Sequence, residues 1–516
     1  MTFRADGSSW AIATPHTAAT HAGTAAFERG GTAIDAALHA AVTLAVVYPH
    51  MCGVGGDLFA LVQRSDGETL AISSSGRSPA AANPDALASE REMPIRGPVP
   101  ITVPGAVAGW DALHTTGALL PWADAFESAS ALADDGSTVS RSLAGSLLDP
   151  DAPFATDPGL ADVFFPGGRA AVLGATVRQP ALARTLRTLA HDGPAALYGG
   201  ALGRAYALGL SAAGSPITIE DLAAHTASVL APMRAAFRDL HVSVVPPNSQ
   251  GFALLQMLAL VERLGIDPDL DGAAAGRIAR VIVAANVDRD RHLADPDRMR
   301  VHPSSLLEDG HLAALAEDAR DPVPVPGRPD GDTIALVTAD AEGNAVSLIQ
   351  SLFWGFGSGI LEPVTGIAAQ NRGACFTLER DHPNRFAPGA RPFHTLMPVL
   401  VHDTAGLVGV AGTMGGYQQP QINLHTITKT FVAGAHPADA VAAPRWVVLG
   451  ADEGRRPPQV GLEPGVPAAA EEALRAEGTF ELTQEDAFGH AHLIRRTQDG
   501  FLVGSDPRAD GSAAAG

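Results

Sequence analysis

Apolar residues follow helical spacing in some parts of the chain and strand-like spacing in others. The most apolar run covers residues 33–47, follows a Gly–Gly pair and ends before Pro49. An aspartate and a histidine interrupt it, and a bilayer span needs about 20 apolar residues, so the run predicts a buried helix. Leucines also recur at helical intervals in "PALARTLRTLAHDG" and "FALLQMLALVERLG", which predict two further helices.

Two stretches predict pairs of strands. Glycines turn the chain into two apolar runs joined at "RSDGET", which is typical of a hairpin. Residues 333–340 and the following "AVSLIQS" predict a second strand–turn–strand, with Thr333 as its first residue. Residues 134–138 and the proline-rich 321–332 are expected to be loops. The final "ADGSAAAG" offers little to bury and is expected to fray.

Composition and charge exclude several classes of partner. Of the 516 residues, 46% are hydrophobic and 18% charged, which is typical of a globular protein with a substantial core. The formal net charge of −21 would be repelled by phosphate and anionic lipid, so neither nucleic acid nor a membrane surface is an expected partner. Two cysteines are too few for a disulfide framework. The first residues lack a basic segment leading into a long apolar one, so we expect a cytoplasmic protein.

Thr333 directly follows an aspartate and the proline-rich run. A threonine hydroxyl is a weak nucleophile that needs a base. Cleavage between Asp332 and Thr333 would create an α-amine with a pKa near 8 on the same residue, and this amine could act as the base. By itself, however, a threonine at the start of a strand is more typical of an ordinary β-former.

The motifs around Thr333 resemble those of the γ-glutamyltranspeptidase family. They include "GDTIALVTADAEGNAVSLIQS", "NRGACF", "RPFHTLMPVLV" and "AGTMGGYQQPQ", in the family's order, and the N-terminal "GGTAIDAALHAAVTLAVVYPHMCGVGGDLF" resembles it as well. The resemblance implies an α+β fold, the αββα sandwich of N-terminal-nucleophile hydrolases. It further implies a precursor that cleaves itself into a large subunit, residues 1–332, and a small subunit, residues 333–516. The two would stay associated, and two such heterodimers could pair. No metal or organic cofactor is implied.

The same resemblance assigns the catalytic residues. Thr333 matches the nucleophile, and Ser351 falls where the family has a second threonine that hydrogen-bonds it. Gly415 and Gly416 match the paired glycines whose amides form the oxyanion hole. Glycine allows such a close approach of the backbone to one oxygen.

The substrate-binding positions depart from the family pattern. The family's arginine for the substrate α-carboxylate falls at Ser75, with Arg77 two residues later, and its aspartate for the α-ammonium falls at Cys375. Other positions expected to bind substrate are Phe353, Arg372, His394, Thr395 and Tyr417. A thiol cannot replace a carboxylate beside a buried ammonium. The segment between Phe376 and Arg391 is also short, so the lid over the pocket is expected to be missing.

This pattern resembles the amidohydrolase branch, which includes oxamate amidohydrolase and the cephalosporin (glutaryl) acylases. An acyl group with a carboxylate and no α-amine would suit Arg372 and Arg77, although either arginine could be structural instead. Glutathione and other γ-glutamyl amides remain the family's usual small-molecule substrates. A chain that stays uncut and only binds a ligand is the alternative outside enzymes.

Three other motifs have alternative interpretations. His490 and His492 would share one face of a strand and could bind a metal, but no third ligand is near in the sequence, which favours structural histidines. The glycine-rich residues 53–57 lack the lysine of a phosphate-binding loop. Cys375 has no evident histidine partner in the sequence, which argues against an independent nucleophile.

Overall fold

Two antiparallel sheets of seven strands form the centre of the fold. The structure is a computed structural model that describes residues 3–149, 154–320, 331–450 and 458–516. The first sheet has the order β1 (Arg4–Gly7), β20 (Gly500–Ser505), β19 (Ala491–Thr497), β15 (Gly406–Thr413), β14 (Val399–Asp403), β9 (Leu240–Val244) and β8 (Met233–Phe237). The second has the order β21 (Ser512–Ala515), β2 (Trp10–Thr14), β10 (Asp332–Asp340), β11 (Ala345–Phe353), β3 (Asp57–Gln63), β4 (Thr69–Ser74) and β7 (Ser228–Leu230).

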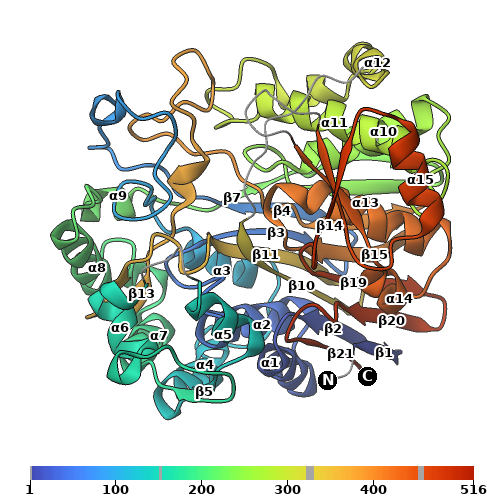
Figure 1. The fold of residues 1–516 in the computed structure, drawn as a ribbon. Helices are drawn as coiled ribbons and strands as arrows, with labels where there is room; N and C mark the ends of the chain where they lie inside the picture. Colours follow the sequence, from blue (N-terminus) through green and yellow to red (C-terminus); the bar gives the residue numbers. More distant parts are fainter. Residues whose placement is uncertain (1–2, 150–153, 321–330, 451–457) are drawn as a thin grey trace.

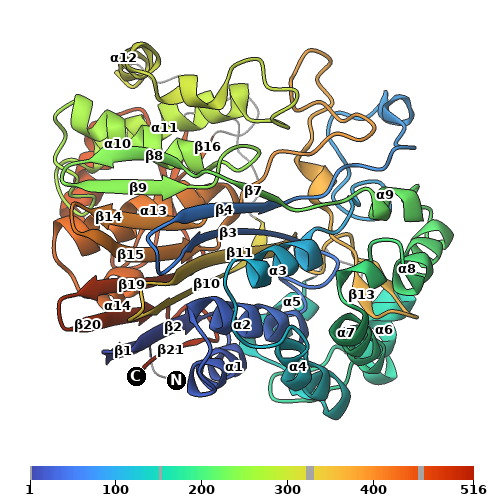
Figure 2. The same ribbon diagram turned by 180° about the vertical axis from the view of Figure 1, so that it is seen from behind.

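Helices cover the outer face of each sheet (Figures 1 and 2). The second sheet is covered by α1 (Thr17–Glu28), α2 (Ala33–Val47), α3 (Ala106–Thr115), α4 (Asp124–Asp135), α7 (Pro180–Asp192) and α8 (Ala201–Ala212). The first is covered by α10 (Gly251–Arg263), α11 (Ala275–His292), α12 (Asp309–Asp318), α13 (Gln419–Ile427), α14 (Pro437–Ala442) and α15 (Ala468–Ala476). Shorter elements are α5 (Arg141–Leu147), α6 (Pro158–Phe164), α9 (Ile219–Ala223), β5 (Ser137–Thr138), β6 (Thr176–Val177), β12 (Leu361–Glu362), β13 (Ile367–Ala368), β16 (Trp446–Gly450), β17 (Gln459–Leu462) and β18 (Glu481–Gln484). The predicted αββα sandwich is confirmed.

Strand β10 is buried on both faces because it lies in the middle of the sandwich. Ala335 and Val337 face the first sheet, whereas Ile334 and Leu336 face the helices. This double burial explains the weak alternation of polar and apolar residues in its sequence. The strand begins at Asp332, one residue earlier than predicted, so Thr333 is its second residue.

The other predicted elements are largely confirmed. Helix α2 has the predicted bounds, and a capping box between Thr32 and Asp35 fixes its start. β3 and β4 form the predicted hairpin, and the two leucine-rich runs are α7 and α10. Residues 134–138 are not all loop, since α4 continues to Asp135 and Ser137–Thr138 is a short strand. Residues 321–330 of the predicted proline-rich loop lie outside the described residues.

The C-terminus is ordered, which corrects the expectation that it frays. Residues 512–515 form β21, which pairs antiparallel with β2. The Gly516 carbonyl accepts hydrogen bonds from the amides of Ser8, Ser9 and Trp10. The small side chains of this segment pack against the neighbouring layers.

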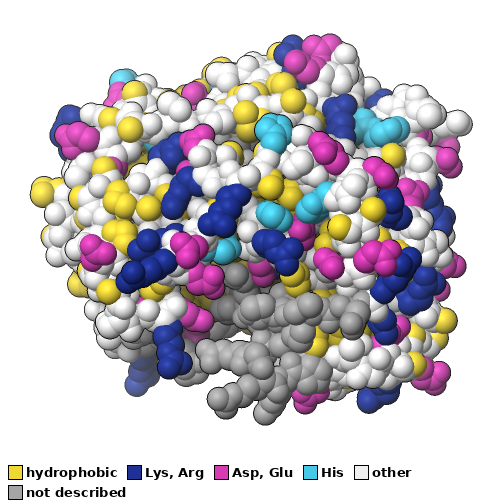
Figure 3. Space-filling model, turned by 90° about the horizontal axis from the view of Figure 1, so that it is seen from above, with side chains coloured by type: hydrophobic (Ala, Val, Ile, Leu, Met, Phe, Trp, Pro, Cys, Tyr) yellow, Lys and Arg dark blue, Asp and Glu magenta, His cyan; other side chains and the backbone are white. Residues whose placement is uncertain are grey.

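Both sheets contain strands from before and from after position 332. Strand β11 lies between β3 and β10, for example, and β2 lies between β10 and β21. Two fragments cut at this position would therefore share one core. No helix in the described ranges is long and apolar enough to cross a membrane. On the face seen from above, the described arginines and acidic residues are interspersed (Figure 3).

A buried charge on the last strand should destabilise the fold. Ala513 is 5% exposed and faces the space between the sheets, so Ala513→Asp should cost about 2 kcal/mol or more and lower the melting temperature of a chain of this length by about 2 °C or more. Circular dichroism measures this shift. Ala236→Asp, the same change at an exposed strand position, is the control. Equal melting temperatures for the two variants would contradict the ordered C-terminal strand.

Candidate active site

Thr333 lies where the pairing of β10 with β11 is irregular. Asp332 is opposite Phe353, whereas Ile334 is opposite Gln350, so one strand is bulged between these pairs. A bulge redirects the side chain at that point. The Thr333 side chain is fully buried, and its hydroxyl donates a 3.1 Å hydrogen bond to Ser351 Oγ.

The Ser351 hydroxyl connects the nucleophile to the peptide bond before it. Ser351 Oγ donates a 2.6 Å hydrogen bond to the carbonyl oxygen of Asp332. It accepts from Thr333 Oγ1 at 3.1 Å and from the Phe353 amide at 2.8 Å. A hydroxyl has one proton, and Ser351 donates its proton to the Asp332 carbonyl group, which is thereby polarised. Phe353 itself has a φ of 84°, a left-handed conformation that is strained for a phenylalanine.

Arg372 lies against the same hydroxyl. Its side chain is fully buried, with Nη2 donating to Ser351 Oγ at 3.3 Å and Nη1 to Thr395 Oγ1 at 3.1 Å. Its guanidinium carbon lies 4.1 Å from the centre of the Phe353 ring, within the range of a cation–π contact. The Nε–H group is buried and has no hydrogen-bond acceptor within the described residues.

Three predicted substrate-binding residues form an apolar wall beside this cation. Phe353, Cys375 and Tyr417 belong to one buried cluster, and the Cys375 sulfur lies 3.6 Å from Arg372 Nη1 and 3.9 Å from the Tyr417 hydroxyl. The other fully buried members of the cluster are Phe252, Leu293, Leu306 and Phe393. The structure therefore places a buried guanidinium beside an aromatic and aliphatic surface.

Gly415 and Gly416 form a turn at the end of β15. Their φ angles are 131° and 50°, which favour glycine, and a Cβ on Gly415 would lie 2.8 Å from the Ile422 side chain. The turn leads through a short 3₁₀ segment into α13. The amides of both glycines have no acceptor among the described residues, as is usual at the start of a helix. Free amides at such a start are suited to binding an anion.

Ser75, Arg77 and His394 make their contacts outside this group. Arg77 forms ion pairs with Asp295 at 3.1 Å and Asp297 at 3.3 Å, which favours a structural role for this arginine. Ser75 Oγ is buried and accepts from the Asn248 side chain at 3.1 Å. Arg77 also lines a separate cavity of about 190 Å³.

Asp57 is a residue that the sequence analysis missed. One oxygen accepts from the amides of Gly76 and Gly105, both at 3.1 Å, and the other lies 3.1 Å from His394 Nε2. Burial raises the pKa of Asp57 to about 7, and burial holds the pKa of His394 well below its usual value, so the imidazole is neutral. Asp57 is opposite Ser351 in the sheet, so it fixes the segments around the site. An aspartate that opens a strand after "GVGG" was the only signal in the sequence.

Asp332 carries a second perturbed carboxyl. Burial raises its pKa to about 6, although the Gly355 amide and the charge of Arg96 act in the opposite direction. The residue before the nucleophile is partly buried in the structure.

His490 and His492 are buried, and their ring centres are 5.8 Å apart. None of their ring nitrogens has a hydrogen-bond partner in the part of the chain described. No group of three or more metal-ligating side chains occurs among the described residues. The geometry therefore favours the structural alternative.

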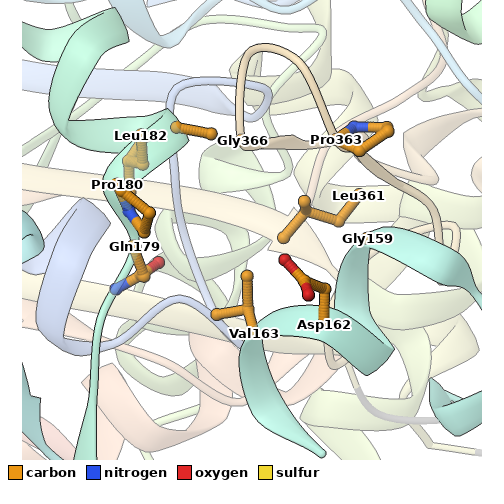
Figure 4. Close-up of a pocket in the computed structure, with 10 residues that line it drawn as sticks. Gly159, Asp162, Val163, Gln179, Pro180, Leu182, Leu361, Pro363 and Gly366 are labelled. Carbon is orange, nitrogen blue, oxygen red and sulfur yellow. The ribbon is translucent and has the colours of Figure 1, made fainter.

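Another pocket lies between α6, α7 and the β12–β13 hairpin (Figure 4). Its volume is about 40 Å³, enough for a few water molecules. It is lined by Gly159, Asp162, Val163, Gln179, Pro180, Ala181, Leu182, Leu361, Pro363 and Gly366. A pocket of this size is too small for an amide substrate.

The four-layer fold with this site is that of the N-terminal-nucleophile hydrolases, a class of amide-cleaving enzymes. The chain belongs to the gamma-glutamyltranspeptidase family, whose model matches residues 19–516. It is 37% identical to the oxamate amidohydrolase proenzyme of Klebsiella pneumoniae over 97% of both chains, and 35% identical to the glutathione hydrolase-like YwrD proenzyme of Bacillus subtilis over 98% of both. A cephalosporin acylase from Bacillus halodurans is 33% identical and has a TM-score of 0.91, over 99% of this chain and 97% of that one. The protein is therefore an enzyme with hydrolase and acylase relatives.

Burial of His492 should make the protein sensitive to acid. Burial lowers the pKa of His492 to about 3, so between pH 7 and pH 5 the unfolded chain binds a proton here that the folded protein does not. Stability should fall by about 2 kcal/mol over this interval because of this one group. His492→Leu should therefore lose less stability on acidification than the wild type.

Urea unfolding at the two pH values measures this difference. His191→Leu is the control, because the His191 side chain is 88% exposed. An unchanged pH dependence in His492→Leu would contradict a neutral buried His492.

Proposed function

We propose that the protein is a self-cleaving amide hydrolase and acyltransferase whose nucleophile is Thr333 at the start of the small fragment. The observation that supports this most directly is that one hydroxyl, Ser351 Oγ, bonds both the Thr333 hydroxyl and the Asp332 carbonyl. The nucleophile and the carbonyl that it would attack are thus held in one hydrogen-bonded group. Relatives from Klebsiella pneumoniae and Bacillus subtilis are named proenzymes, which also supports processing.

Self-cleavage would proceed through an ester. The Thr333 oxygen attacks the Asp332 carbonyl carbon, the carbon–nitrogen bond breaks, and the hydroxyl proton ends on the departing nitrogen. Water then hydrolyses the ester, which leaves a free carboxylate on Asp332 and a free α-amine on Thr333. That amine is the base that the hydroxyl otherwise lacks.

Turnover of an amide would use the same oxygen. The α-amine accepts the Thr333 hydroxyl proton while the oxygen attacks the substrate carbonyl, and the amides of Gly415 and Gly416 stabilise the oxyanion. The leaving amine takes the proton, and an acyl-enzyme remains. Water releases the acid, or an acceptor amine takes the acyl group.

The acyl group is proposed to carry a carboxylate and no α-amine. Arg372 has a buried Nε–H group without an acceptor among the described residues, on the same guanidinium that bonds Ser351, and an unsatisfied buried donor costs about 1–3 kcal/mol. A substrate carboxylate would satisfy it. Cys375 offers no negative charge for an ammonium, which disfavours γ-glutamyl amides and a role in glutathione metabolism. A small amide of the oxamate type is the substrate class that suits this site best.

Loss of the nucleophile should abolish self-cleavage. Thr333→Ala should remain one chain, whereas the wild type should give fragments 1–332 and 333–516 whose masses sum to the precursor plus one water. Intact mass spectrometry measures this. Thr338→Ala is the matched control, because Thr338 is a buried threonine of the same strand whose hydroxyl bonds the Ala33 carbonyl. A wild type that stays intact would favour the non-catalytic alternative.

Loss of the buried cation should change substrate preference. Arg372→Gln should reduce kcat/KM for oxamate, and the ratio of oxamate to the uncharged oxamide should fall by at least about tenfold, since a charge-assisted hydrogen bond is lost. Steady-state kinetics on both amides measure the ratio.

Arg77→Gln is the matched control and should leave the ratio unchanged. A fall of the oxamate-to-oxamide ratio in Arg77→Gln instead, or glutathione turnover as fast as oxamate turnover, would contradict the assignment of Arg372 as the carboxylate-binding residue.

A further inference from the structure

Two side chains from the N-terminal part of the chain hold the glycine turn in place. Gln250 immediately precedes α10 and is fully buried. Its Nε2 donates to the Gly416 carbonyl at 2.9 Å and to the Thr395 carbonyl at 2.8 Å. One side-chain amide therefore connects the turn to the residue that also contacts Arg372.

Arg289, on α11, fixes the orientation of that amide. Arg289 Nη1 donates to Gln250 Oε1 at 3.1 Å and to the Tyr417 carbonyl at 3.2 Å. Its Nε donates to Asp290 at 2.9 Å, and its guanidinium carbon lies 5.3 Å from the centre of the Tyr417 ring. Because a cation occupies the Oε1 side, the Gln250 NH₂ group must face the two carbonyls.

These contacts hold the C-terminal side of the turn that carries the two amides. The Gly415 carbonyl, which shares a peptide with the Gly416 amide, accepts from the Gln418 amide at 2.8 Å. The Gly416 carbonyl, which shares a peptide with the Tyr417 amide, accepts from Gln250 and from the Gln419 amide. The peptide planes on both sides of Gly416 are therefore held. Glycine has little intrinsic preference for one backbone conformation, so loss of the Gln250 bond would weaken the hold on the Gly416–Tyr417 peptide and let the turn that carries both amides change shape.

We propose that Gln250 and Arg289 are positioning residues that hold the Gly415–Gly416 turn as an oxyanion hole for substrate amides. The inference rests on the proposed function. It also gives the large fragment a role in turnover, since both residues precede position 332 and the turn follows it. The small fragment would thus contain the nucleophile and the turn but not the groups that keep the turn in shape.

Self-cleavage should not need this support. In the uncut chain the Asp332 carbonyl oxygen is already bonded by Ser351 Oγ at 2.6 Å. The carbonyl broken during processing and the carbonyl of a later substrate would therefore use different hydrogen-bond donors. Loss of Gln250 should slow substrate turnover and leave processing intact, which a general loss of stability would not do.

The test uses Gln250→Met, which keeps the side-chain length and removes both N–H donors. Processed enzyme should show a kcat for oxamate about 10- to 100-fold below the wild type, with KM within about twofold, because a displaced oxyanion donor weakens only the transition state. Processing, followed by intact mass, should keep its wild-type rate. Arg289→Lys keeps the charge beside Asp290 and should lower kcat in the same direction by a smaller factor.

Gln421→Met is the matched control. Gln421 is also a buried glutamine, on α13, that donates to the Val448 carbonyl at 3.0 Å and accepts from the Val448 amide at 2.7 Å. Its kcat should stay near the wild-type value. A wild-type kcat in Gln250→Met, or a fall equal to that of Gln421→Met, would overturn the proposal.

Hydrogen exchange separates this proposal from the proposed function. Exchange of the amides in residues 414–418 needs no substrate, so it decides the role of Gln250 even if the wild type neither processes itself nor cleaves any amide. Faster exchange in Gln250→Met than in Gln421→Met supports the positioning role, and equal exchange refutes it.

Discussion

The hydrogen bond from Ser351 to the Asp332 carbonyl is the interaction on which the site depends. It lies where the pairing of β10 and β11 is irregular between Asp332 and Ile334, and the Thr333 hydroxyl bonds the same Ser351 oxygen on the neighbouring strand. A slip of one residue in this register would move Thr333 to the opposite face of the sheet. The double burial of β10 makes such a slip costly, because it would exchange the two sets of side chains that fill the cores above and below the strand.

The charge of the site is set by the side chains that are buried around the Ser351 hydroxyl. Arg372 is a full positive charge inside the protein, contacted by Thr395 and by the Phe353 ring. The cost of burying it is offset only in part by these neutral partners, which leaves an attraction for an anion. Cys375 adds sulfur and no charge. Under the proposed function the site would therefore bind one negative group, whereas a γ-glutamyl group would bring a positive group as well.

The sequence predicted the elements whose signals are local. Helix α2 was predicted because its apolar run follows a Gly–Gly pair and ends before a proline, and the β3–β4 hairpin because its turn is short and polar. The motifs around Thr333 predicted the αββα sandwich through family resemblance. The roles of the site residues stay predictions. The hydrogen bonds of Ser351 indicate which atoms each role would involve.

The rest depended on contacts between distant segments. β21 is a run of small residues with no periodic pattern, so its sequence does not predict a strand. It pairs with β2 and packs against the neighbouring layers, which are formed by distant segments. Arg77 has the same sequence signal as Arg372, yet two aspartates more than two hundred residues away engage it. Asp57, Gln250 and Arg289 act through main-chain groups of other segments, and no local pattern marks a side chain of that kind.

The central claim is that Thr333 becomes a chain end and carries the acyl group. Acid quenching during turnover of a carboxylate-bearing amide, followed by peptide mapping, tests it most directly. The account predicts that the acyl mass is found on a peptide that begins with Thr333 as the N-terminus of the small fragment. Turnover by a chain whose Asp332–Thr333 bond is intact, or an acyl group on any other residue, would contradict it.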